Sequence, residues 1–563
     1  MKHRFFLLPA LLLAAPFFFV SCTNYFMKKI LGDFPGSFVP VSGIEVITTV
    51  PRQQKDIPLY LIGSVIPQNA SYKNIIWTVV SGGTIIGNTL TPDAAGSIME
   101  LRATITDGIA RNRDFTEVYT IQTLNGGYDT PWLVYDETTL RKVGTGADGW
   151  GLDSGYLQID SITLKAGNFN SIGSYASEFL GSYTVASCNN AYHTITGLTI
   201  EEQLSSNHGL FGCIGINMPH IPKPYIRGVT LIDCDISGQY FIGGIVGYNT
   251  GGTVEECSVR GLITGESTIG GIVGANDGGF VINCSAIGDI AGTNNEIGGV
   301  VGNNLSGGTV EKCLFSGTVK GEENTGGVVG YNSYSYVFNC YAAGDITGTG
   351  WNAGGIAGHN YFNGRIEKCY YSAGVINGYL NTGGIAGQNS SNSHILNCYA
   401  TGDIGAANLN SGGVVGENSD SGSTVLYCYA AGEVNGYDNI AGIAGVNNGA
   451  VQFCVAMNKN IGGGHYAGSQ IGRVMAVPVP LTDNDCNYAR NDMNITWNDN
   501  NDGRQIPKNM ITHDGIRSFW NDTNDLSVWD IDKTASSIWT WGEPDLPILR
   551  NMPAGTQNPV IRN

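Results

Sequence analysis

Four acidic residues recur at one point of a repeated sequence pattern and offer the chemistry of sugar-cleaving enzymes. They are Asp289, Asp345, Asp403 and Glu433. Glycosidases use two carboxyl groups that face the sugar from neighbouring positions. Asp403 and Glu433 are expected one repeat apart, so they could form such a pair. The same column holds Thr318, and no Arg or Lys recurs beside it, which favours a solvated turn position without catalysis.

Cysteines form a second column. The chain has 13 Cys, and nine of them are expected at one position of successive repeats: Cys234, Cys257, Cys284, Cys313, Cys340, Cys369, Cys398, Cys428 and Cys454. Side chains stacked in register stay near the strand spacing of about 4.8 Å, which is wider than the ~3.8 Å between the Cβ atoms of a disulfide. We therefore expect buried free thiols, with disulfides between some repeats as the alternative. Because no CxxC or paired His accompanies them, neither a metal nor a cofactor is expected.

Tyrosines follow the cysteine directly on four successive repeats: Tyr341, Tyr370, Tyr399 and Tyr429. Side chains alternate between the two faces of a strand, so tyrosines next to inward cysteines are expected to point outward. A flat aromatic stripe of this kind can stack on sugar rings or on a protein partner. The alternative is a purely structural ladder of rings, worth about 0.5–1 kcal/mol for each pair.

Asparagines form the most regular column of the sequence. Eight of them lie two residues after a Gly that closes a glycine-rich pentapeptide: Asn249, Asn276, Asn304, Asn332, Asn360, Asn389, Asn418 and Asn447. Their amides could hold ions or sugars. Stacked amides more readily hydrogen-bond one another and the turn backbone. We therefore expect a structural ladder.

These columns belong to a repeat of 27 to 29 residues. Its marker is a pentapeptide such as GGIVG, GGVVG or GGIAG, which begins at residues 243, 270, 298, 326, 354, 383, 412 and 441. A period this regular indicates stacked units. Each unit has three short apolar segments separated by Gly and Asn turns, which predicts one turn of a right-handed parallel β-helix. A β-propeller needs longer repeats, of about 40 residues or more.

The repeats resemble the GLUG motif of bacterial surface and secreted proteins. The matching segments are "HGLFGCIG" at residues 208–215, "NCYAAGDITG" at residues 339–348 and the pentapeptides with their Asn. The resemblance implies a β-helix and a surface location, but the family shares no single biochemical activity. We assign the repeats to residues 206–476. Residues 124–205 and 477–563 resemble the lead-in and closing segments of such proteins.

The closing segment contains five tryptophans: Trp497, Trp520, Trp529, Trp539 and Trp541. A β-helix must cover its last turn, because an open edge can pair with other chains. We expect these aromatic residues to plug that end. The Asp- and Asn-rich stretch at residues 482–503 could suggest a calcium site. It does not match the EF-hand pattern, because a loop that begins at Asn498 has Asn509 at its twelfth position, where the pattern requires Glu.

The first 22 residues are typical of an export signal. A basic start at residues 1–4 precedes an apolar run at residues 5–20 and then Ser21-Cys22. The end of this run resembles the lipobox of bacterial lipoproteins, which implies a lipid on Cys22 and an envelope location, outer membrane or cell surface. An ordinary secretory signal is the alternative.

A small β domain is expected between the signal and the repeats. Residues 23–41 are a linker, and residues 42–123 resemble a bacterial Ig-like domain of group 2. That resemblance implies a β-sandwich that acts as a spacer. Short alternating segments broken by turn residues agree with it, and Trp77 is the expected core aromatic.

Composition limits the remaining options. The 563 residues include 81 Gly, and only 13% are charged; Gly costs about 1 kcal/mol at a helical position, which excludes long helices. The net charge of −18 opposes nucleic acid as a partner. We expect an all-β protein, an Ig-like β-sandwich followed by a right-handed parallel β-helix with end caps.

The expected function is structural or adhesive, without catalysis. The expected partners are the membrane, through the lipid, and glycans or proteins on host or neighbouring cells. A β-helix enzyme that acts on polysaccharides through the acidic column is the alternative.

Overall fold

The computed structural model describes most of the chain and almost all of its repeats. The described residues are 38–46, 52–53, 59–93, 98–165, 167–188, 191–215, 223–463, 469–477, 486–495, 503–507, 510, 517–520, 529, 531–534, 536–542, 546–552, 557, 559 and 561–562. Regular structure in them is nearly all β, with short helical segments such as α2 (Glu137–Lys142). Among them, no helix is long and apolar enough to cross a membrane. The expected all-β class is confirmed.

The chain divides into two compact units, Met1–Asn125 and Gly126–Asn563. The first unit holds small antiparallel sheets around a core that includes Trp77, Leu90, Met99 and Leu101. The Ig-like assignment of this unit stays a prediction. Its strands are β1 (Gly43–Val46), β2 (Arg52–Gln53), β3 (Leu59–Tyr60), β4 (Gly63–Ile66), β5 (Ile76–Ser81), β6 (Gly83–Ile86), β7 (Thr89–Pro92), β8 (Ile98–Ala110) and β9 (Arg113–Thr123).

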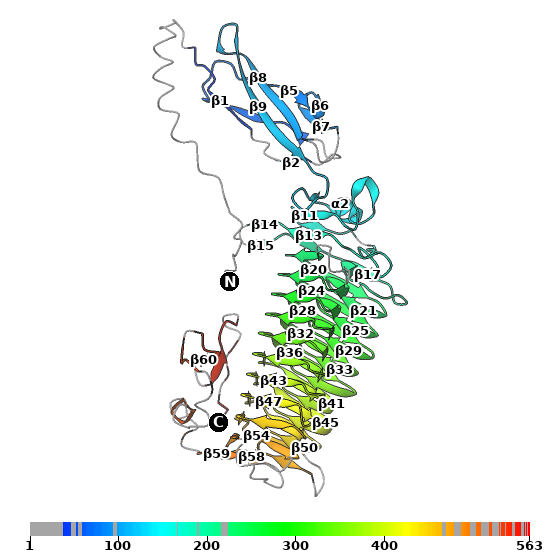
Figure 1. The fold of residues 1–563 in the computed structure, drawn as a ribbon, viewed down its shortest axis with the longest axis vertical. Helices are drawn as coiled ribbons and strands as arrows, with labels where there is room; N and C mark the ends of the chain where they lie inside the picture. The colour runs from blue at the N-terminus through cyan, green and yellow to red at the C-terminus, as the bar shows by residue number, and fades with distance from the viewer. Residues whose placement is uncertain are drawn as a thin grey trace, which may run out of the picture. The chain divides into compact units, whose positions relative to one another are not determined.

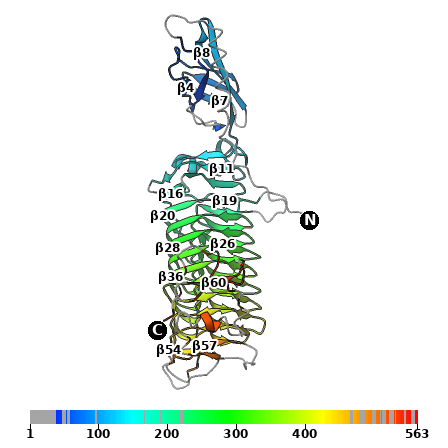
Figure 2. The ribbon, with the colours of Figure 1, turned by 90° about the vertical axis from the view of Figure 1, so that its left-hand side faces the viewer.

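The second unit is a parallel β-solenoid of about twelve turns, which confirms the expected β-helix (Figures 1 and 2). Three sheets run along it, and we call them face 1, face 2 and face 3 in the order in which each repeat visits them. Face 1 consists of β18 (Phe211–Ile214), β22 (Val246–Thr250), β26 (Val273–Asp277), β30 (Val301–Leu305), β34 (Val329–Ser333), β38 (Ala357–Tyr361), β42 (Ala386–Asn389), β46 (Val415–Asn418), β51 (Ala444–Asn447) and β56 (Met475–Val477).

Face 2 is built from the short segments that precede the cysteines. It consists of β10 (Trp132–Val134), β11 (Gly155–Gln158), β13 (Ser182–Val185), β19 (Tyr225–Arg227), β23 (Thr253–Glu255), β27 (Phe280–Ile282), β31 (Thr309–Glu311), β35 (Tyr336–Phe338), β39 (Arg365–Glu367), β43 (His394–Leu396), β47 (Thr424–Leu426) and β52 (Ala450–Gln452). The central residue of these strands, such as Val254, Val281 or Val310, points into the solenoid and is fully buried.

Face 3 is the widest sheet and holds two strand segments of each central turn. The first segments are β12 (Ile162–Thr163), β16 (Thr194–Thr196), β17 (Thr199–Glu201), β20 (Thr230–Ser237), β24 (Ser258–Gly265), β28 (Ser285–Gly292), β32 (Leu314–Gly321), β36 (Tyr341–Gly348), β40 (Tyr370–Tyr371), β44 (Tyr399–Ala400), β48 (Tyr429–Ala430) and β53 (Val455–Ala456). The second segments are β21 (Tyr240–Gly243), β25 (Ser267–Gly270), β29 (Asn295–Gly298), β33 (Glu323–Gly326), β37 (Trp351–Gly354), β50 (Asp438–Ala441) and β55 (Ile471–Gly472). The strands β41 (Val375–Gly383) and β45 (Asp403–Gly412) run from the end of the first segment into the second, and β49 (Val434–Gly436) and β54 (Asn460–Gly463) continue first segments. The last pairings of this sheet involve β57 (Tyr488–Arg490), β58 (Asn494–Ile495) and β59 (Arg504–Ile506).

The central repeats therefore contain four strands each, where the sequence predicted three, and the last two contain five. The long strands of face 3 contain a glycine that the sequence suggested as a turn residue, and this glycine keeps the strand in register. Gly288 adopts φ 141°, and a Cβ atom on it would lie 2.0 Å from the carbonyl oxygen of Gly261 in the preceding turn. Only glycine tolerates that approach, so the strand continues through it.

The closing segment folds back along the outside of the solenoid. Its hairpin, β60 (Trp539–Trp541) and β61 (Pro547–Leu549), pairs antiparallel and packs against the outer side of face 3. Trp539 contacts Tyr399, and Trp520 contacts Tyr429. The expectation that the tryptophans plug the last turn is therefore wrong for these two residues, which cover the side of the rod; Trp497 lies outside the described residues.

Candidate functional site

The asparagine column is a continuous ladder of buried amides along face 1. Each Nδ2 donates a hydrogen bond to the Oδ1 of the next asparagine, from Asn249 to Asn447, at 2.7–2.9 Å. The same Nδ2 groups donate to a carbonyl of the adjoining turn at 3.0–3.3 Å. These amides therefore hold the turns of the protein together and are not free to bind an ion or a sugar.

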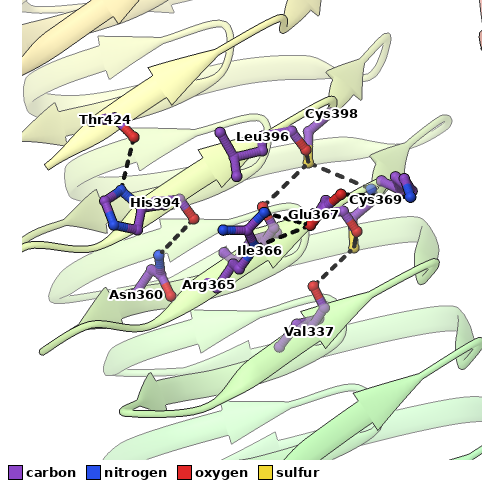
Figure 3. Close-up of polar contacts among 11 residues, drawn as sticks. Val337, Asn360, Arg365, Ile366, Glu367, Cys369, His394, Leu396, Cys398 and Thr424 are labelled. Atoms are coloured by element: carbon purple, nitrogen blue, oxygen red, sulfur yellow. Dashed lines mark hydrogen bonds and ion pairs between the residues drawn. The ribbon is translucent and has the colours of Figure 1, made fainter. Parts of the chain in front are cut away.

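The cysteine column lies inside the solenoid beside face 2 (Figure 3). The Cys369 Sγ lies 3.6 Å from the carbonyl oxygen of Val337, and the Cys369 N–H donates to the Cys398 Sγ over 3.4 Å. All nine predicted cysteines are buried free thiols in the structure, but Cys234 lies within β20 of face 3 and not in the column. Burial disfavours the thiolate and raises the pKa of the Cys257 and Cys313 thiols well above the ordinary value. Such thiols behave as small apolar side chains.

The four tyrosines stack face to face along the outside of face 3. Neighbouring rings from Tyr341 to Tyr429 lie 4.9–5.0 Å apart and within 5° of parallel. The closing segment covers them: the Tyr429 hydroxyl donates to the Pro547 carbonyl at 2.7 Å, and the Tyr399 hydroxyl donates to the Gln557 Oε1 at 2.9 Å.

The sequence correctly placed the tyrosines outside the solenoid, but the stripe is covered and not open to a sugar or to a protein partner. Tyr370, Tyr399 and Tyr429 have no exposed surface, and only Tyr341, at the edge, is partly open. Burial raises the pKa of the Tyr399 and Tyr429 hydroxyls well above the ordinary value. The tyrosine stripe is therefore the surface on which the closing segment of the same chain packs.

The acidic column is engaged in contacts within the chain. Asp403 accepts a hydrogen bond from the Glu433 N–H at 2.9 Å and pairs with Arg562 at 2.6 Å. Glu433 lies 4.0 Å from the same guanidinium and accepts from Asn460 at 2.7 Å. The pair that could have resembled a glycosidase site therefore holds Arg562 of the closing segment.

The two remaining acids also bond to the next turn. Asp345 accepts from the Val375 N–H at 3.0 Å, and Asp289 accepts from the Thr318 hydroxyl at 2.6 Å. These contacts agree with a structural role at the turn edge. Among the described residues, no group of three or more His, Cys, Asp or Glu is placed to hold a metal ion.

A second ladder of amides was not predicted from the sequence. Asn352 donates to Asn324 at 2.9 Å, and the pattern continues to Asn381, Asn410 and Asn439 at 2.7–2.9 Å. All five adopt a left-handed backbone, which Asn tolerates better than most residues. The signal was present: an Asn recurs two residues before the Gly that opens four of the pentapeptides, and before Ala441 in the fifth.

A cluster of aromatic residues at the turn from face 1 to face 2 was also missed. We call it the aromatic corner; it consists of Tyr331, Tyr334, Tyr336, His359, Tyr361 and Phe362. The rings of Tyr334 and Phe362 lie 6.2 Å apart on neighbouring turns. Both residues have a left-handed backbone, with φ of 53° and 42°. This conformation costs a residue with a side chain about 1–2 kcal/mol.

A cavity of about 420 Å³ lies where the solenoid begins, lined in part by Phe169, Tyr175 and His208. The His208 Nε2 is 2.8 Å from the Ser205 Oγ, and burial lowers the pKa of this histidine. A serine beside a neutral imidazole is the pairing that nucleophilic hydrolases use. Ser205 is not among the residues that line the cavity, so the pair does not present its hydroxyl there.

Comparison with protein families agrees with this geometry. The GLUG motif matches residues 238–264, 321–347 and 378–405, and each match spans one turn of the solenoid. The chain carries GLUG motif repeats. A search of curated proteins finds no match to this chain.

One solved structure resembles this chain in part. It is a crystal structure described as "a putative immunoglobulin A1 protease from Bacteroides ovatus". The similarity covers 76% of this chain and 94% of that one, at 15% identity and a TM-score of 0.27. A similarity this weak has no bearing on what this chain does.

Proposed function

We propose that this chain is a non-catalytic lipoprotein of the bacterial cell envelope whose solenoid is a scaffold for ligand binding. Cys22, which lies outside the described residues, is the proposed site of the lipid. The proposed location is the outer membrane or cell surface. The proposed ligands are glycans or proteins of a host or of neighbouring cells.

One contrast supports this proposal. The thiols, most amides and the four acids of the repeats bond to other parts of the same chain, whereas several large aromatic side chains remain on the outside. Tyr334, Tyr336, Trp351 and Phe362 are 48–58% exposed. Exposed aromatic residues on a rigid support suit binding, because they supply contact area at a small entropic cost.

Binding is tested with residues 23–563, the mature chain without the lipidated Cys22, on arrays of glycans and of extracellular-matrix proteins. Serum albumin on the same surface is the control for nonspecific adsorption. The proposal expects retention on at least one class of ligand and none on albumin. Absence of binding on both arrays would remove the support for an adhesive role.

Lipid anchoring is tested separately in bacteria that produce the full chain. Metabolic labelling with an alkyne fatty acid should mark the wild-type protein in the membrane fraction. The Cys22→Ser variant should lose the label and leave that fraction. A variant that keeps the label, or a wild type that never acquires it, would contradict lipidation at this residue.

A further inference from the structure

We propose that the aromatic corner is a binding site for a neutral carbohydrate chain. The inference rests on the proposed binding function and names its ligand class and its location. It is carried by three observations: the backbone of two residues, the arrangement of the rings and the charge around them.

The backbone at this corner is the first observation. In the three preceding turns the equivalent residues are the small Gly251, Gly278 and Ser306, which adopt φ of 74°, 68° and 54°. Tyr334 and Phe362 adopt the same left-handed conformation while their side chains are 58% and 52% exposed. Burial does not offset this strain. Strained residues that packing does not explain are concentrated at functional sites.

The arrangement of the rings is the second observation. Tyr334 and Phe362 occupy neighbouring turns, and Tyr336 is exposed on the adjoining strand of face 2. Behind them, the partly buried rings of Tyr331 and Tyr361 lie 5.8 Å apart. Because the solenoid fixes the spacing of its turns, successive exposed rings can stack on successive units of a chain-like ligand. Sugar rings offer C–H faces that pack on aromatic rings, with hydroxyl groups at the edge.

The charge around the corner is the third observation. Arg365, which pairs with Tyr336 between strands, bonds to Glu367 of its own strand at 2.8 Å (Figure 3). Burial lowers the pKa of His359 to about 4, so its imidazole is neutral. Next to the rings lie amide and hydroxyl groups, such as Asn363, which accepts from Asn392 at 2.6 Å. These neutral groups suit a sugar better than an acidic or a basic partner.

Titration calorimetry of the mature chain tests the proposal, with cellohexaose, mannohexaose and an oligogalacturonate as probes. The decisive variant is Tyr334→Gly/Phe362→Gly, which removes both rings and restores the residue that two of the earlier turns use. The matched control is Tyr379→Ala, which removes an exposed ring from face 3, outside the aromatic corner. We expect a neutral hexasaccharide to bind the wild type and the control alike, and the double variant about tenfold more weakly, a change of about 1.4 kcal/mol.

Thermal unfolding of the same samples separates a binding role from a structural one. Glycine relieves the left-handed strain, so the double variant should unfold at the same temperature as the wild type or higher. A lower unfolding temperature together with unchanged binding would mean that the rings are structural, and would overturn the proposal.

Two further outcomes distinguish this inference from the proposed function. If the double variant binds glycans as the wild type does, or if the corner binds only a matrix protein, the carbohydrate site is wrong but the binding scaffold stands. If the wild type binds neither glycan nor protein, both are wrong.

Discussion

Removal of one amide from the middle of the asparagine ladder should destabilise the solenoid locally. Asn276 is fully buried, and its side chain takes part in three hydrogen bonds. It donates to the Gly279 carbonyl at 3.0 Å and to the Asn304 Oδ1 at 2.8 Å, and it accepts from Asn249 at 2.8 Å. The variant Asn276→Ala deletes all three.

The cost follows from what the deletion leaves behind. The Gly279 carbonyl keeps the Thr309 N–H as a donor, and the Asn249 Nδ2 keeps the Gly252 carbonyl as an acceptor. The Asn304 Oδ1, which is buried, loses its donor. The orphaned buried acceptor costs about 2 kcal/mol, and the other two lost hydrogen bonds, whose partners keep another contact, cost about 0.5 kcal/mol each. We expect a local destabilisation of about 3 kcal/mol.

Hydrogen exchange measured by mass spectrometry locates this change. In a repeat protein each turn contacts its neighbours, so the loss should concentrate in the turns on either side of residue 276. A local cost of about 3 kcal/mol corresponds to roughly a hundredfold faster exchange of amides that open locally. The control is Asn295→Ala on face 3, whose side chain is exposed and whose loss should change stability by less than about 0.5 kcal/mol. If the two variants exchanged alike, the ladder would not be what holds the turns together.

Three other predictions follow from buried aromatic and thiol groups. Trp539→Ala removes a fully buried ring beside Tyr399 and Tyr429, and should lower the free energy of unfolding by about 3–5 kcal/mol. Proteolysis of the closing segment should be faster in this variant than in Trp541→Ala, which removes a partly exposed ring. The pKa values of Tyr399 and Tyr429 are raised in the folded state. Their contribution to the free energy of unfolding is therefore complete below about pH 10, the pKa of tyrosine in the unfolded chain, and is lost as the pH rises above that value. The unfolding temperature, measured from pH 8 upward, should fall less in the Tyr399→Phe/Tyr429→Phe variant than in the wild type. The thiols of the cysteine column should react with iodoacetamide only after unfolding, and rapid alkylation of the native protein would contradict their burial.

The features that repeat along the sequence could be predicted from it. The pentapeptide recurs often enough to fix the turns of the solenoid, and the amide ladder on face 1 follows once equivalent residues stack. Alternation also placed Tyr370 correctly on the outside. These inferences need only the relation between one turn and the next, which the sequence contains many times.

The contacts that join distant parts of the chain could not be predicted in this way. The Tyr429 hydroxyl bonds to Pro547, 118 residues away, and Arg562 pairs with Asp403, 159 residues away. No periodic pattern links these residues, so the cover over the tyrosines and the Arg562 contact of the acids could not be predicted. The aromatic corner was missed for another reason: other turns carry a small or polar residue at the position of Tyr334 and Phe362, and only alignment of the turns makes the two aromatic residues visible.

The most direct test of a binding scaffold without catalysis is a measurement of turnover. The mature chain is incubated with neutral and acidic polysaccharides, and the release of new reducing ends is followed against a buffer blank. The account predicts binding without any release above the blank. Release of reducing ends that stops in the Asp403→Asn or Glu433→Gln variant would contradict it, and would assign catalysis to the acids that pair with Arg562.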